Sequence, residues 1–403
     1  MGAALLAALR LRLRPNPQSA IANPQSAILV FLGWRFLTFL TTVVAGQFGG
    51  EGAPADLGVI LRRSSDRWDA GWYLAIAREG YSISDTGQAN VAFYPLLPAL
   101  IRLLSFVAPW RVAGALVVNV ALLGAVLYLY ALVQLDYDEP TALRAVVFLL
   151  LFPTAIFLTA IYTESLLLLT MIAAIYHARR GHWWAAGLWG LAAGLTKLVG
   201  ALVVVALLWE WVRQVRAAGF QRRHLPHLIA VALPPLGSLA FLAYLHLRFG
   251  SYQVYFTVQE AWYRQSSFRP FFPDGWNFLT AFLRGDGQSV VNYFYPQAGT
   301  TIPSPNAFMV LDLAFLVVGL VVGLIYCLYI RASYGLLVLA ILGLAAYSGS
   351  PQSLNRIALI LFPLPIAFAL AGRSRPVAAI LFIVSGLLSV YHTFLFVNAF
   401  WAG

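Results

Sequence analysis

Long apolar runs separated by short polar intervals dominate the chain. A bilayer core about 30 Å thick is crossed by a helix of about 20 apolar residues, so each long run is a candidate span. The pattern predicts an all-α polytopic membrane protein with about eleven transmembrane helices. The expected spans lie at about 28–46, 111–134, 143–161, 164–178, 183–197, 199–213, 225–248, 306–330, 334–348, 354–371 and 377–400.

The composition agrees with this pattern. Of the 403 residues, 61% are hydrophobic and 10% are charged, and the mean hydropathy is +0.79. A net charge of +11 would favour a nucleic-acid partner in a soluble protein. Here the arginines cluster between apolar runs, as cytoplasmic loops do, so we expect membrane lipids and no nucleic acid as partners. The single Cys327 excludes an intramolecular disulfide.

Basic residues predict the orientation. Arg10, Arg12 and Arg14 precede the first span, so we expect a cytoplasmic N-terminus and an outer location for 47–110. Two prolines interrupt the run 91–108, which we expect to lie at the membrane surface without crossing. Only then do the later arginine-rich loops fall on the cytoplasmic side.

This orientation defines the expected organisation. A short tandem repeat marks residues 1–27 as a low-complexity cytoplasmic leader, and 28–403 is expected to form one transmembrane domain. Within it, 47–110 is the first outer loop and carries a juxtamembrane helix. The polar and aromatic stretch 251–305 is the second large outer loop.

The first outer loop holds two carboxylates among aromatic residues. Asp66 and Asp69 lie close to Trp68, Trp72 and Tyr81. Aromatic faces can cover a sugar ring while a carboxylate takes a hydroxyl proton, so the stretch is a candidate sugar-binding and proton-transfer site. The alternative is an aromatic belt at the membrane interface with an incidental aspartate.

Four ionisable residues stand within or beside apolar runs and are expected on the outer side: Arg35, Glu164, Lys197 and Arg356. Such residues are costly in a bilayer and often mark a cavity or a pathway. The alternative for each is a buried ion pair or a side chain that reaches to water. Lys197 lies between Gly194 and Gly200, where small residues let the backbone approach a ligand. Arg356, at the outer end of a span, is a candidate phosphate ligand.

The second outer loop contributes Gln259, Glu260 and Trp262 as further candidate binding residues. The alternative is an amphipathic helix at the interface. The six histidines show no metal-ligand spacing on one side of the membrane. No glycine-rich phosphate loop is present, which argues against nucleotide hydrolysis. We therefore expect no metal and no cofactor.

Several short motifs follow one another in a specific order. They are Trp68-Asp69 with Tyr73, Gly80-Tyr81, 92–98 (AFYPLLP), 152–157 (FPTAIF), 162–166 (YTESL), 194–200 (GLTKLVG), Gln259 with Trp262, and Asn355-Arg356 ahead of Phe362-Pro363. Together they resemble the GPI mannosyltransferase 2 (PIG-V) family and, more broadly, the GT-C class of multi-spanning glycosyltransferases. The similarity runs from about residue 28 to the C-terminus. One departure is Lys197, where the resemblance leads us to expect an arginine.

The resemblance implies a GT-C-type bundle and an inverting glycosyltransferase. It implies a polyprenyl- or dolichyl-phosphate-linked donor, usually of mannose, and a lipid-linked or other glycan acceptor used on the extracytoplasmic side. It also implies that Asp69 is the catalytic carboxylate. We expect a monomer in a bacterial inner or plasma membrane, or in the endoplasmic reticulum if the source is eukaryotic.

Three alternatives remain at this point. Asp66, three residues earlier, is the rival base. A transporter or flippase of lipid-linked sugars would share the intramembrane charges, although the chain lacks the paired repeats typical of transporters. A catalytically inactive scaffold is the third.

Overall fold

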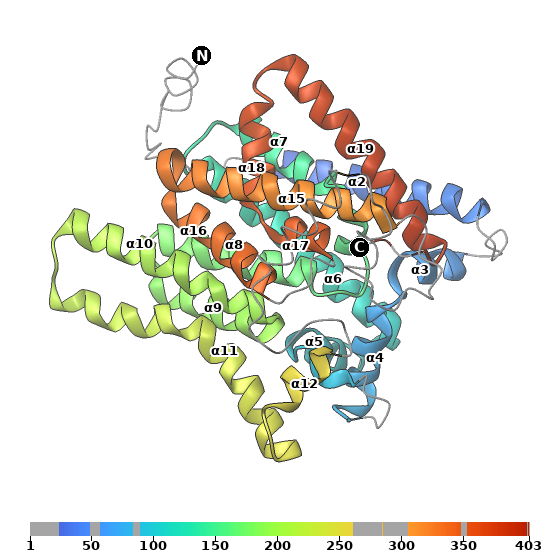
Figure 1. Cartoon of the computed structure of the whole chain (residues 1–403), viewed down its shortest axis with the longest axis horizontal. Coiled ribbons are helices and arrows are strands. Elements are labelled where there is room, and N and C mark those ends of the chain that lie inside the picture. Colours follow the sequence, from blue (N-terminus) through green and yellow to red (C-terminus); the bar gives the residue numbers. More distant parts are fainter. Residues whose placement is uncertain are drawn as a thin grey trace.

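Helices form the described part of the chain, which comprises residues 24–48, 57–83, 89–260, 284, 305–347, 353–400 and 402 of a computed structural model (Figure 1). The α-helices are α2 (Gln25–Gln47), α3 (Leu57–Ser65), α4 (Asp69–Glu79), α5 (Leu96–Leu104), α6 (Trp110–Gln134), α7 (Glu139–Leu150), α8 (Glu164–Arg179), α9 (Trp183–Thr196), α10 (Val203–Ala218), α11 (Leu225–Phe249), α12 (Val254–Glu260), α15 (Pro305–Ile325), α16 (Ala332–Tyr347), α17 (Leu354–Ile360), α18 (Pro363–Ala371) and α19 (Arg375–Val397). Shorter 3-10 or π segments are η1 (Asn90–Ala92), η2 (Ala155–Leu158), η3 (Leu198–Leu202), η4 (Arg222–His224) and η5 (Tyr326–Ile330).

Helix α8 lies at the centre of the fold. Thirteen of its 16 residues are buried, and it packs against α6, α9, α10 and α17. A helix that is apolar on all sides is stable only when other helices surround it. Since α8 begins at Glu164 and ends at Arg179, its length of about 24 Å connects two polar clusters.

Five helical segments in the described ranges are long and apolar enough to cross a membrane. They are α2, α6, η3 with α10, η4 with α11, and α19. The bent pair α17–α18 is a sixth if it forms one span. Outward side chains such as Leu29, Phe36 and Leu387 are more than half exposed, as expected for contact with lipid. The chain is therefore a multi-pass membrane protein.

The expected number of eleven spans is not confirmed. The apolar helices α7, α8 and α9 have only 12, 16 and 14 residues. Helix α5, within the proline-interrupted run 91–108, has nine residues and is too short to cross a bilayer. Its position relative to the membrane stays a prediction, as do the domain limits. Most of 1–27 and of 251–305 lies outside the described residues.

The expected span 143–161 is wrong as a single helix. Helix α7 ends at Leu150, two residues before Phe152-Pro153, because a proline disfavours helical conformation in the residue before it. The chain then continues as a buried irregular stretch with the short segment η2. Its polar groups find protein partners: the Ile161 N–H donates to the Ser65 carbonyl at 2.9 Å, and the Ser165 hydroxyl donates to the Leu158 carbonyl at 2.7 Å. Irregular backbone at membrane depth is tolerated where protein satisfies it in this way.

The expected span 354–371 is also not one straight helix. Helices α17 and α18 meet at an angle of 78° at Leu361-Phe362, immediately before Pro363. Proline lacks the N–H needed to continue a helix and clashes with the preceding turn. The bend leaves α17 as a separate short helix, and this helix carries Arg356.

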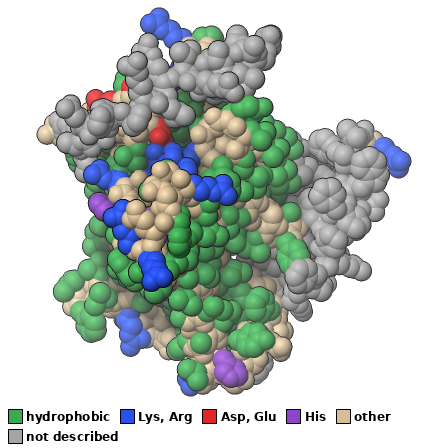
Figure 2. Space-filling view, turned by 90° about the vertical axis from the view of Figure 1, so that its left-hand side faces the viewer, with side chains coloured by type: hydrophobic (Ala, Val, Ile, Leu, Met, Phe, Trp, Pro, Cys, Tyr) green, Lys and Arg blue, Asp and Glu red, His purple; other side chains and the backbone are tan. Residues whose placement is uncertain are grey.

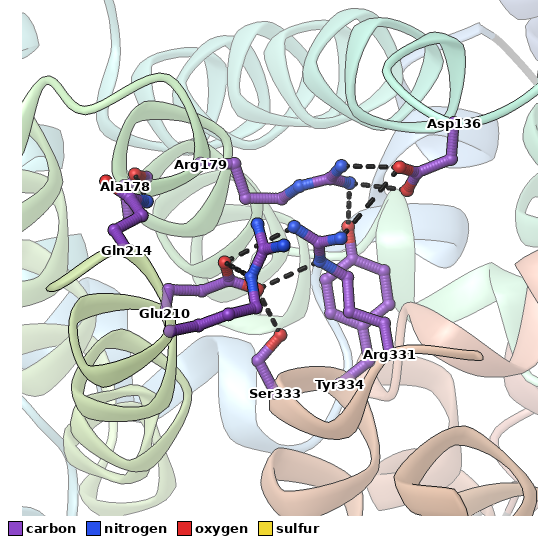
Figure 3. Close-up of polar contacts among 9 residues, drawn as sticks. Asp136, Ala178, Arg179, Glu210, Gln214, Arg331, Ser333 and Tyr334 are labelled. Carbon is purple, nitrogen blue, oxygen red and sulfur yellow. Dashed lines mark hydrogen bonds and ion pairs between the residues drawn. The ribbon is translucent and has the colours of Figure 1, made fainter. Parts of the chain in front are cut away.

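A second polar cluster lies at the Arg179 end of α8 (Figure 3). Arg179 donates from both terminal nitrogens to the Asp136 carboxylate, each at 2.6 Å. Arg331 binds the buried Glu210 at 2.9 Å, and the Ser333 hydroxyl donates to the same carboxylate at 2.6 Å. These bonds join the ends of α6 and α8 and the start of α16 to the middle of α10. The α10–α11 hairpin faces the viewer in Figure 2, where Lys and Arg side chains gather among hydrophobic ones.

Candidate active site

The turn between α3 and α4 places Asp69 at the first position of α4. The residue before it, Trp68, has φ 51°, a value that costs a non-glycine residue about 1–3 kcal/mol. The Tyr162 hydroxyl bridges the two residues on either side of Trp68. It donates to the Arg67 carbonyl at 3.2 Å and accepts from the Asp69 N–H at 3.1 Å. A buried tyrosine from a distant part of the chain therefore holds the turn in its strained shape.

Asp69 belongs to a chain of four alternating charges. Arg356 donates from one terminal nitrogen to Asp69 at 3.1 Å and to Glu164 at 2.9 Å. The Lys197 ammonium lies 3.4 Å from the same Glu164 oxygen. The structure thus brings together four residues singled out from the sequence, and their formal charges sum to zero. Charge-assisted bonds of this kind are the stronger ones in a protein interior.

Two aromatic rings enclose the guanidinium of Arg356. Its central carbon lies 4.7 Å from the Phe157 ring centre and 4.8 Å from the Tyr162 ring centre. Cation–π contacts with desolvated rings stabilise a guanidinium by up to about 2 kcal/mol. Both rings come from the irregular stretch after α7, which explains why the family-like FPTAIF and YTESL motifs surround the site.

Exposure distinguishes the members of this cluster. The Asp69 side chain is 25% exposed and that of Lys197 is 29% exposed, whereas Glu164 is at 1% and Arg356 at 12%. A group that takes a proton from a bound substrate must be reachable. Asp69 and Lys197 are the accessible members of the cluster, and the less exposed Glu164 and Arg356 bind them.

The structure places Asp66 outside this cluster. Its carboxylate forms an ion pair with Arg111, the second residue of α6. It lines a hollow together with the arginines of α3. The two carboxylates of the turn therefore have different partners, although three positions separate them.

The aromatic residues of the first outer loop have different surroundings from one another. Trp72 stacks on Phe93, with ring centres 5.9 Å apart and an interplanar angle of 17°. Trp68 is half exposed. Tyr81 donates its hydroxyl to the Phe93 carbonyl at 2.8 Å and packs on Phe241 of α11. Tyr81 thus packs against a small separate hydrophobic cluster, and its role in binding stays a prediction.

Tyr73, one turn after Asp69, is fully buried and donates its hydroxyl to Thr163 at 3.4 Å. Burial, together with the Asp69 and Glu164 carboxylates, raises the pKa of this hydroxyl above its usual value. Tyr73 therefore remains protonated at physiological pH, where it can donate a hydrogen bond but cannot serve as a base.

The candidates of the second outer loop are only partly described. Gln259 lies half buried in α12, which packs on η1 and α11. Glu260 is the last residue of α12. Trp262 lies outside the described residues.

Arg35 does not join the cluster around Asp69. Its guanidinium lies 5.9 Å from the ring of Trp34 on the same helix, and it forms no ion pair with another described residue. Within the described ranges, no three His, Cys, Asp or Glu side chains lie close enough together to hold a metal ion.

The glycines beside Lys197 pack closely against neighbouring backbone, and their expected approach to a ligand stays a prediction. A Cβ on Gly194 would lie 2.0 Å from the Pro234 carbonyl oxygen of α11, and one on Gly200 would lie 2.0 Å from the Ala193 carbonyl oxygen. These glycines allow close packing of backbone on backbone. That packing fixes the break between α9 and η3, at which Lys197 is extended.

Sequence reasoning missed Asp312, a buried carboxylate in α15. Its Oδ1 accepts from the backbone N–H of Asn355 at 2.7 Å, and the Thr154 hydroxyl donates to the Asn355 carbonyl at 3.1 Å. Asn355 directly precedes Arg356, so these two bonds position the arginine. An acidic residue inside an apolar run was the available signal.

Comparison with known proteins identifies similar sequences. The family described as Mannosyltransferase (PIG-V) matches residues 58–267, which include Asp69, Glu164 and Lys197 but not Arg356. The GPI alpha-1,6-mannosyltransferase 2 of Rattus norvegicus is 33% identical over 142 residues, and that of Mus musculus is 33% identical over 144 residues. Each match covers 32% of this chain and 28% of the relative, so it spans little more than a quarter of the relatives' length.

Among solved structures, the oligosaccharyltransferase AglB of Archaeoglobus fulgidus in complex with an inhibitory peptide and a dolichol-phosphate has a TM-score of 0.43 and 13% identity. The match covers 92% of this chain and 55% of that one. The oligosaccharyltransferase of the same organism in its apo form gives 0.47 and 12%, with coverage of 93% and 56%. These scores are too low to establish a shared fold.

Proposed function

The chain belongs to the mannosyltransferase (PIG-V) family, and we propose that it transfers a sugar, mannose, from a polyprenyl-phosphate-linked donor to a glycan or glycolipid acceptor. The observation that carries this proposal is the partly exposed Asp69, which Arg356 binds and links through Glu164 to the partly exposed Lys197. The curated relatives are named as mannosyltransferases, which supports the choice of sugar.

Asp69 is the proposed general base. Its carboxylate takes the proton of an acceptor hydroxyl, and the hydroxyl oxygen attacks the anomeric carbon of the donor sugar. The bond between that carbon and the phosphate oxygen breaks on the opposite face, so the anomeric configuration inverts. Polyprenyl phosphate leaves with the bonding electron pair. The ion pair of Asp66 with Arg111, away from this cluster, favours Asp69 as the base.

Lys197 is the proposed partner of the leaving phosphate. Arg356 already binds two carboxylates and lies between two rings, so its geometry suits it to orienting Asp69. Lys197 is the more exposed of the two cations. A donor phosphate would add negative charge to a cluster whose formal charges sum to zero. The ammonium would then interact favourably with the charge that develops on the departing oxygen.

The site is proposed to open to the extracytoplasmic side of the membrane. The arginine-rich α10–α11 hairpin and Arg179 lie at the other end of α8 from Glu164, which agrees with an inner location for the arginine-rich end. A lipid-linked donor is suited to such a site, since it reaches the active site from within the bilayer.

The decisive experiment uses purified protein with polyprenyl-phosphate-mannose and a panel of glycolipid and glycan acceptors. We expect mannosylated acceptor and released polyprenyl phosphate. Asp69→Asn should abolish transfer, a loss of at least about 1,000-fold, while the donor still binds. Asp66→Asn is the matched variant and should retain most of the activity.

Two outcomes would contradict the proposal. Full activity of Asp69→Asn with loss in Asp66→Asn would move the base to Asp66. Relocation of an unchanged lipid-linked sugar across reconstituted vesicles, with no product from any acceptor, would indicate a flippase.

A further inference from the structure

A group of exposed arginines lies where α10 turns into α11, on the face shown in Figure 2. Arg216 lies in the last turn of α10, and Arg222 and Arg223 lie in η4. Arg180, directly after α8, is exposed as well. We call these four residues the hairpin surface. In the described part of the chain, none of them forms an ion pair with a carboxylate.

The carboxylates of this part of the chain have partners elsewhere. From α8 through α11 the sequence contains only two, Glu164 and Glu210. Glu164 belongs to the candidate active site, and the fully buried Glu210 binds Arg331. Residues 89–260 are described without a gap, so the hairpin and its neighbouring helices are all in view. The four arginine charges of the hairpin surface therefore have no carboxylate partner among the described residues.

The turn between α8 and α9 lies against the hairpin, which makes the four arginines one surface. The Gln214 side-chain amide of α10 donates to the Ala178 carbonyl of α8 at 2.8 Å (Figure 3). At the start of α9, Trp183 stacks on His227 of α11, with ring centres 5.8 Å apart and an interplanar angle of 22°. These contacts bring Arg180 to the side of the hairpin that carries the other arginines.

Apolar side chains lie beside the arginines. Phe220, Trp184 and Leu225 are 63%, 52% and 47% exposed. The segments η3 with α10 and η4 with α11 are both long and apolar enough to cross a membrane. A turn between two spanning helices lies at the level of the lipid head groups. At that depth aromatic and aliphatic side chains reach the acyl chains, while guanidinium groups bind phosphate oxygens in pairs.

We infer that the hairpin surface binds the phosphate groups of anionic lipids in the leaflet around it. Clusters of basic residues at the end of a spanning helix are attracted to anionic lipid. A soluble acidic partner would match the arginines but not the exposed Phe220, Trp184 and Leu225, whereas a lipid matches both. The inference goes beyond the proposed function and does not rest on it.

The test measures lipid binding to the purified full-length protein in a neutral detergent. Native mass spectrometry compares phosphatidylglycerol with phosphatidylcholine at several concentrations of ammonium acetate. We expect phosphatidylglycerol to bind at least about 10-fold more tightly, and we expect salt to reduce this preference by screening the charges. Equal binding of the two lipids would overturn the inference and leave the surface to a soluble acidic partner.

A second arm adds inorganic phosphate as a competitor. Because the acyl chains of a bound lipid would also contact the apolar residues beside the arginines, millimolar phosphate should displace phosphatidylglycerol only weakly. Complete displacement would indicate a site for free phosphate and would overturn the assignment to a lipid.

Charge variants locate the site. Arg222→Gln with Arg223→Gln should weaken phosphatidylglycerol binding by at least about 10-fold. Arg78→Gln with Arg248→Gln removes the same charge from exposed positions on α4 and at the other end of α11, and should leave the binding unchanged. All four positions are exposed, so both double variants should unfold at the temperature of the unchanged protein. Equal losses in the two double variants, or none in the hairpin variant, would refute the inference.

The inference and the proposed function can fail separately. Asp69→Asn should bind phosphatidylglycerol as tightly as the unchanged protein, since Asp69 does not belong to the hairpin surface. Binding without any transfer activity would preserve the lipid surface and reject the enzyme. Transfer with no preference for the anionic lipid would reject the lipid surface alone.

Discussion

At the scale of single residues, Asp69 acquires its environment from residues far away in the chain. Tyr162 lies 93 positions away and Arg356 lies 287 positions away, yet both bind Asp69 directly. The sequence identifies Glu164, Lys197 and Arg356 as candidates because a charge in an apolar setting stands out, and it identifies Asp69 by its aromatic neighbours. It contains no information about which of them pair, or that Arg356 orients a carboxylate.

The hydroxyl of Tyr162 provides the first prediction. Tyr162→Phe removes two hydrogen bonds that hold the strained turn at Trp68, each worth about 1 kcal/mol. We expect kcat to fall by about 10-fold, with a smaller change in KM, in steady-state assays of sugar transfer. Tyr130→Phe is the matched control, because its buried hydroxyl binds Glu139 away from the site. Equal effects of the two variants would exclude a specific role for Tyr162.

Asp312 provides the second prediction, as a positioning residue for Arg356. Asp312→Leu leaves the buried Asn355 N–H without its acceptor, at a cost of about 1–3 kcal/mol. We expect both a lower unfolding temperature and a loss of kcat of about 10-fold. Asp312→Asn retains a carbonyl oxygen and should restore most of the activity. An inactive Asp312→Asn that folds normally would show that the charge itself is required.

At the scale of helices, proline and glycine explain most of the differences between expectation and structure. The sequence pattern does not distinguish a spanning helix from a buried irregular stretch, because both are apolar. Thus 143–161 resembles a span, although only its first part is helical. Its irregular part supplies Phe157, and Tyr162 follows directly after it; the rings of these two residues enclose Arg356.

The contact of α9 with α11 provides the third prediction. Gly194→Ala places a methyl group against the Pro234 backbone, where neither helix can move aside cheaply. We expect a loss of about 3 kcal/mol in the free energy of unfolding. Gly343→Ala on α16 meets open space and should be neutral or slightly stabilising. Thermal unfolding of the detergent-solubilised variants measures both, and a stable Gly194→Ala would contradict the packing described here.

At the scale of the whole molecule, two polar clusters lie at opposite ends of the buried helix α8. The cluster around Arg356 has two partly exposed members, whereas the four charged residues at the other end are at most 15% exposed: Asp136, Arg179, Glu210 and Arg331. The first arrangement suits chemistry. The second suits the joining of helices, because each of its charges is matched by a close partner.

The orientation of the molecule provides the fourth prediction. In a Cys327→Ser background, Ile83→Cys and Arg222→Cys place single thiols at exposed positions of the first outer loop and of the α10–α11 hairpin. A membrane-impermeant maleimide added to intact cells should label only the first. Permeabilised cells should allow labelling of both. The reverse pattern would place the active site on the cytoplasmic side.

The sequence by itself determined the membrane class and most of the residues too polar for lipid, because each depends on local composition. Only the tertiary structure decided that Asp66 and Asp69 have different partners, that Tyr162 holds the turn, and that Asp312 positions Arg356. Such pairings depend on which distant segments pack together, and local pattern does not specify this. Asp69 was recognisable from its neighbours in sequence, whereas its partners were recognisable only in space.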